Sequence, residues 1–98
     1  MEINLGLTND ALYAGCEIEE VAGRLNLKTP VDEATNIVGR NIHELVAAVP
    51  AEDRHEVVLT GPMAVWAYLI VFHAVVHAFS AVYYSDGRGK YLIAKHGA

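Results

Sequence analysis

The C-terminal part of the chain contains the side chains best suited to chemistry. Three of the five histidines, His73, His77 and His96, share it with Asp86 and Arg88, which lie in a glycine-rich turn. A guanidinium is a forked donor that fits a phosphate group. Histidines four residues apart on a helix share one face and could ligate a metal ion. These residues indicate that the chain binds an anion or a metal, or does both.

The charge distribution assigns an anionic ligand to the same part of the chain. The formal net charge is -5, yet residues 57–98 contain one acidic residue, Asp86, and three basic ones, Arg88, Lys90 and Lys95. An acidic protein does not coat nucleic acid, which requires a basic surface, so we expect no binding to duplex DNA.

The elements that would position these side chains form a strand, a helix and a strand. Residues 56–60 have the apolar run of a buried strand, residues 62–78 are helical and apolar nearly all round, and residues 79–84 form the next strand. A strand–helix–strand unit places its two strands parallel. The apolar helix predicts that another subunit covers part of it.

The carboxyl ends of these parallel strands define one edge of the sheet. Thr60, Gly61 and Pro62 follow the first strand and begin the helix, while Asp86 and Arg88 follow the second strand. Ligands of such folds usually bind at this edge, and the free N–H groups of a helix N-terminus suit phosphate. We therefore expect an anion-binding site here.

The histidines belong to the opposite edge. His77 ends the helix, and His96 follows a last strand at residues 90–95 that returns to that edge. A strand of this length separates His96 from Asp86 by about 20 Å. The two groups can act together only if two molecules supply one site. Read singly, the residues also have simpler explanations: His73 can be a packing residue, Asp86 a turn former and His96 part of the tail.

The N-terminal half predicts the rest of a single α/β domain over residues 1–98. Residues 2–8 and 11–18 read as a hairpin, and residues 29–49 as a helix with Thr29 as its N-cap. The expected element order is β-β-α-β-α-β-β, a mixed sheet flanked by helices.

The expected compartment is the cytoplasm. Cys16 is the single cysteine, so no disulfide framework exists, and the first residues do not resemble a signal peptide. No charged side chain occurs between Val57 and Ser85, but Gly61-Pro62 interrupts the run. We expect no membrane span.

A series of motifs in the second half resembles a known family, the small CRISPR-associated ring nucleases of type III systems, written here as the Csx-three family. About forty residues carry the resemblance through the order and spacing of the motifs. The matching positions are Thr60-Gly61-Pro62, Trp66, His77, Ala81-Val82-Tyr83, Asp86-Gly87-Arg88 and His96.

The resemblance implies a distantly Rossmann-like fold related to CARF domains, which sense cyclic oligoadenylates. It implies Mn²⁺-dependent cleavage of cyclic tetra-adenylate to a linear product, which ends antiviral signalling. It also implies homodimers that stack head to tail into a tetramer or filament around the ring. Arg88 would hold a phosphate, His77 would transfer a proton, Asp86 would bind Mn²⁺ or orient the nucleophile, and His96 would assist.

Two other functions remain open from the sequence. The same Arg88, Thr60 and Gly61 would serve a sensor or sponge that binds the cyclic nucleotide without cutting it. The apolar segment at residues 62–79 could instead belong to a structural or membrane-associated interaction protein.

Overall fold

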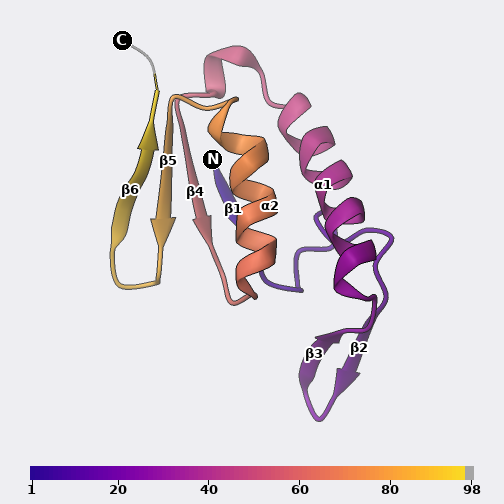
Figure 1. Ribbon diagram of the computed structural model, residues 1–98. Coiled ribbons are helices and arrows are strands. Elements are labelled where there is room, and N and C mark those ends of the chain that lie inside the picture. Colours follow the sequence, from indigo (N-terminus) through magenta and orange to yellow (C-terminus); the bar gives the residue numbers. More distant parts are fainter. Residues whose placement is uncertain (97–98) are drawn as a thin grey trace.

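A computed structural model describes residues 1–96, in which two helices lie on one face of a four-stranded sheet (Figure 1). The sheet has the order β1-β4-β5-β6 and is mixed, because its first three strands are parallel and β6 is antiparallel to β5. Its strands are β1 (Glu2–Asn4), β4 (Glu56–Thr60), β5 (Ala81–Ser85) and β6 (Lys90–Lys95). The α/β class predicted from the sequence is confirmed.

The strand–helix–strand unit is also as predicted. β4 and β5 pair in parallel, and α2 (Val65–Val76) connects them. The second half of the chain was predictable because its apolar runs are continuous and are bounded by the Gly-Pro and Asp-Gly turn signals.

The predicted opening hairpin is wrong. β1 is three residues long and pairs in parallel with β4, whereas residues 5–17 form a chain of turns. The hairpin lies later, between β2 (Ile18–Val21) and β3 (Arg24–Leu27). Ala22 and Gly23 both have positive φ there, as a two-residue hairpin loop of the primed type requires.

The extra strand changes the element order to β-β-β-α-β-α-β-β, with a 3-10 turn, η1 (Ala51–Asp53), before β4. The two-stranded β2–β3 sheet is separate from the main sheet and projects beyond the start of α1 (Figure 1).

Helix α1 (Val31–Ala47) forms where the sequence predicts it, but its cap differs. Pro30 is the N-cap, and the Thr29 hydroxyl accepts a hydrogen bond from the N–H of Glu17 instead. Gly39 does not interrupt the helix. A side chain there would meet Ile70 of α2 at 3.8 Å, so the glycine lies where the two helices approach each other.

The core lies between the helices and one face of the sheet. Val57 and Leu59 of β4 are buried against the helices, while Val58 between them is only half-buried. The expectation that β4 is covered on both faces is therefore wrong for the chain by itself.

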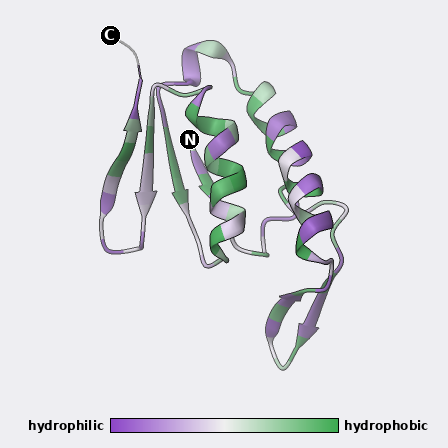
Figure 2. Cartoon of the chain, in the orientation of Figure 1, coloured by the Kyte–Doolittle hydropathy of each residue, from purple (hydrophilic) through white to green (hydrophobic). Residues whose placement is uncertain are grey.

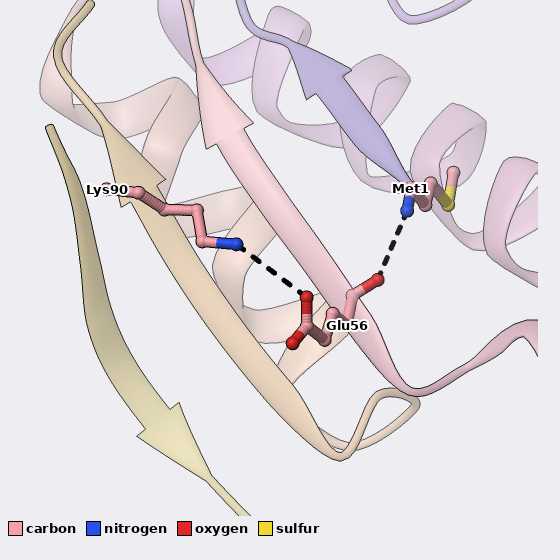
Figure 3. A network of polar contacts seen from close by, with 3 residues as sticks. All are labelled: Met1, Glu56 and Lys90. Atoms are coloured by element: carbon pink, nitrogen blue, oxygen red, sulfur yellow. Dashed lines mark hydrogen bonds and ion pairs between the residues drawn. The ribbon is translucent and has the colours of Figure 1, made fainter. Parts of the chain in front are cut away.

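The other face of the sheet carries charged side chains. Lys90 Nζ lies 3.7 Å from a carboxylate oxygen of Glu56, and the amino terminus of Met1 donates to the Glu56 carbonyl at 3.3 Å (Figure 3). Lys90 also lies over the ring of Tyr83, 4.4 Å from its centroid. We call Glu56, Tyr83 and Lys90 the charged sheet face. Among the helices within residues 1–96, none has the length and apolar character needed to cross a membrane.

Candidate functional site

The residues predicted for anion binding lie together at the carboxyl ends of β4 and β5. All of them except Arg88 surround a shallow hollow of about 310 Å³ between the end of β4 and the turn after β5. Its lining residues are Thr60, Gly61, Pro62, Tyr84, Ser85, Asp86 and Gly87. The parallel pairing of β4 with β5 is what brings these two loops side by side.

The backbone of this edge is tightly specified at Gly61. Its φ is +105°, and a Cβ there would stand 2.2 Å from Oδ1 of Asn4 and 3.0 Å from the backbone nitrogen of Gly6. No other residue fits that position without displacing the loop after β1. The Tyr68 hydroxyl donates to the Gly61 carbonyl at 2.5 Å.

Hydrogen bonds also join the two loops. The Thr60 hydroxyl donates to the Ser85 carbonyl at 3.0 Å. The ring of Tyr68 meets that of Tyr84 edge-on, with centroids 5.6 Å apart. Burial is the main cause that raises the pKa of Tyr68, and the neighbouring Tyr84 raises it further. The hollow is therefore held in shape by contacts from β4, α2 and β5.

Asp86 organises its own turn. Its Oδ1 accepts the N–H groups of Arg88 at 2.8 Å and Gly89 at 2.9 Å. These backbone hydrogen bonds, from Gly89 first and Arg88 second, lower the pKa of the exposed Asp86 carboxyl. The carboxylate is thus a fixed negative charge at the rim of the hollow, with one oxygen occupied by the turn.

Arg88 and the start of α2 supply the positive side of this edge. The Arg88 side chain is exposed and belongs to the same turn as Asp86, although it does not line the hollow. Helix α2 begins at Val65, and no side chain caps its first turn. Its first N–H groups and the positive end of its dipole face this edge.

The histidines lie at the opposite edge. His77 is the C-cap of α2, and its ring meets that of His73 edge-on, with centroids 6.0 Å apart. Ser80 follows His77 by three residues, and its carbonyl accepts a hydrogen bond from the N–H of His96 at 2.6 Å. His77 and His96 are exposed, and the length of β6 separates them from Asp86. One chain does not bring the four proposed catalytic residues together.

Asp86 does not belong to a cluster of metal-binding side chains within residues 1–96. Over the described residues 1–96 there is no group of three or more His, Cys, Asp or Glu side chains placed to hold a metal ion. Asp86, the predicted metal ligand, offers a single carboxylate that is already bonded to its own turn. A metal would require further ligands from a second chain or from the substrate.

Sequence reasoning missed a second hollow on the far side of Pro62, with a volume of about 520 Å³. Its lining residues are Asn4, Gly6, Leu7, Thr8, Arg24, Leu25, Asn26 and Pro62. Asn4 connects the parts of this edge, because its amide donates to Thr8 and its Oδ1 accepts from Gly6. Recognising that β1 lies parallel to β4 would have placed Asn4 beside Gly61.

Comparison with known proteins identifies no relative. No protein-family model, no curated protein and no solved structure matches the chain.

Proposed function

We propose that this protein is a ring nuclease that cleaves cyclic tetra-adenylate to a linear oligoadenylate and so ends type III CRISPR signalling. The main support is the position of its side chains. The phosphate-binding candidates and the proton-transfer candidates lie at opposite edges of one sheet, as a site completed by a second copy requires. The motif resemblance supports the ligand and the distant relation to CARF domains, and the single cysteine, Cys16, supports a cytoplasmic location.

The edge around Thr60 and Asp86 would bind the ring. Arg88 would contact a phosphate, and the uncapped first turn of α2 would supply N–H donors to another. The lowered pKa of Asp86 keeps its carboxylate ionised, so it would orient a hydroxyl nucleophile rather than contact phosphate directly.

The histidines of a neighbouring copy would complete the site, with copies stacked head to tail. An oxygen nucleophile, either water or a ribose 2′-hydroxyl, forms a bond to phosphorus while the bond to the leaving oxygen breaks. His77 would give that oxygen a proton, and His96 would accept the proton that the nucleophile loses while it holds the phosphate. Mn²⁺ remains a predicted cofactor, and Asp86 would hold it together with ligands from the neighbouring copy or the substrate.

The second candidate is a sponge that binds the same ring without cutting it. It is favoured by the separation of the histidines from Asp86 and by the engagement of Asp86 in its own turn. Arg88, Thr60 and Gly61 serve both functions equally.

The deciding experiment incubates labelled cyclic tetra-adenylate with the purified protein, with Mn²⁺, with Mg²⁺ and with chelator. Linear product supports the nuclease, and tight binding of an intact ring supports the sponge. Rings of three and six adenylates serve as matched ligands. The proposal would be overturned if the protein neither bound nor cleaved any of these rings.

A further inference from the structure

We propose that a second copy of this chain binds side by side to an apolar surface formed by α2 and the helix side of β5 and β6, independently of any nucleotide. The surface contains a groove of about 340 Å³. We call it the α2–β6 groove; its lining residues are Leu59, Tyr68, Leu69, Phe72, Tyr84 and Ile93.

The first observation is a second apolar stripe on α2. Ala67, Val71, Ala74 and Val75 face the core, as one stripe of a surface helix should. Val65, Leu69, Phe72 and Val76 follow a separate helical spacing on another side. Val65 is 71% exposed and Leu69 is 63% exposed. A helix with two apolar sides requires cover on both of them.

The second observation is that the sheet extends beyond its helices. Helix α2 packs against α1 and contacts β5, and no helix lies in front of β6 (Figure 1). Tyr91 and Ile93, which lie on the helix side of β6, are consequently about half exposed. Apolar residues predominate along α2 and the middle of β6, whereas polar residues predominate on the β2–β3 hairpin (Figure 2).

The exposed area is sufficient for a stable dimer. Five apolar side chains, each at least a third exposed, leave on the order of 500 Å² uncovered per copy, at the upper end for a monomer surface. A standard interface buries about 800 Å² per partner, of which somewhat more than half is apolar. The side chains counted here are Val65, Leu69, Tyr84, Tyr91 and Ile93.

The shape of the surface favours a copy of the chain itself as the partner. Leu69 forms one wall of the groove and protrudes from it, and Val65 protrudes one helical turn earlier, so a two-fold axis would place this ridge of each copy in the groove of the other. No charged side chain occurs between Val57 and Ser85, so the repulsion expected from a net charge of -5 is remote from the contact. The charged sheet face on the opposite side lacks these properties.

The test is the oligomeric state of the full chain without nucleotide. Sedimentation equilibrium over a micromolar concentration series should show a dimer. Leu69→Asp should weaken it by on the order of 100-fold, because a two-fold interface carries each substitution twice. Leu69 is mostly exposed, so the variant should fold, and circular dichroism would check this. Ile93→Lys on β6 is a second variant with the same expected result.

The matched control is Val21→Asp, which places the same charge on an apolar side chain 49% exposed in the distant β2–β3 hairpin. It should leave the dimer unchanged. A wild-type monomer at all concentrations would overturn the proposal, as would a dimer that Leu69→Asp and Ile93→Lys do not weaken. Association only with added lipid vesicles would assign the surface to a membrane instead.

A crosslink would locate the contact. Leu69→Cys and Ile93→Cys are made as separate proteins, each with Cys16→Ser, and are then mixed under oxidising conditions. The ridge-in-groove contact predicts a mixed disulfide dimer. No crosslink in the mixture would overturn this arrangement. None of these measurements uses a nucleotide, so their failure is distinct from failure of the nuclease proposal.

Discussion

The two edges of the main sheet differ in how their geometry is held. At the carboxyl ends of β4 and β5, the backbone takes conformations that few residues accept, above all at Gly61, and Asp86 bonds its own turn. At the other edge the contacts are ordinary backbone hydrogen bonds between the ends of neighbouring strands, such as the bond from the His96 N–H to the Ser80 carbonyl. The first edge is preorganised, whereas the second presents exposed side chains.

In the proposed nuclease, this contrast would separate ligand binding at the first edge from proton transfer at the second. A preorganised edge can bind a rigid ligand without the entropy cost of ordering loops and side chains, which would otherwise lower the affinity. Exposed histidines on the other edge gain a defined environment only against another surface. One long side chain does reinforce that edge: Arg54 donates to the carbonyls of Val49 and Val46 and thereby caps the end of α1.

The largest expected effect comes from disabling each edge separately. Asp86→Ala and His77→Ala should each lower cleavage of cyclic tetra-adenylate by about 100-fold or more. A mixture of the two proteins should regain part of the activity, because a composite site can pair the intact edges. A cleavage time course measures both. A completely inactive mixture would contradict a site shared between copies.

Gly61→Ala tests the preorganised edge itself. The new Cβ would overlap Asn4 and take a disfavoured φ, so we expect a loss of about 3 kcal/mol or more in the free energy of unfolding. Gly87→Ala is the control, since its φ is +89° but nothing lies within 4 Å; it should lose about 1–2 kcal/mol. Urea unfolding compares them, and equal losses would refute the steric argument.

Arg88→Ala should weaken binding of cyclic tetra-adenylate by about 10- to 100-fold, because a lost charge-assisted hydrogen bond is worth about 1.5–3 kcal/mol. Arg40→Ala removes the same charge from the exposed side of α1 and should leave affinity unchanged. Titration calorimetry with an uncleaved analogue measures both. Identical affinities for the two variants would remove Arg88 from the site.

Asp86→Asn should change the pH dependence of stability. The pKa of Asp86 is lowered in the folded chain, so its contribution is present above the ordinary value of 3.8 and is lost as the pH falls through the folded value. When the pH is lowered below 3.8, the Tm of the wild type should therefore fall further than the Tm of Asp86→Asn. Parallel Tm profiles for the two proteins would show that the turn does not depend on the charge.

The smallest effect is expected on the charged sheet face. Glu56→Gln removes an ion pair with Lys90 whose side chains are both about half exposed, so the unfolding free energy should change by no more than about 1 kcal/mol. Thermal unfolding at low and high salt measures the change. A larger loss would mean that this face is covered in solution.

Much of the second half of the chain could be predicted from its sequence. The uncharged run from Val57 to Ser85, interrupted by Gly61-Pro62, already indicated β4, α2 and β5, and the parallel pairing followed from the connection. The separation of Asp86 from His77 and His96 followed from the same topology.

Residues 1–27 were not predictable in the same way. β1 is too short to show an alternating pattern, and Asn4 came beside Gly61 only because the strand pairs with β4, more than fifty residues away. The sequence offered turn formation as an explanation of Asp86, but turn signals do not show which oxygen accepts which N–H. Local patterns thus determined the elements, whereas long-range pairing and side-chain packing decided the shape of the binding edge and the exposed side of α2.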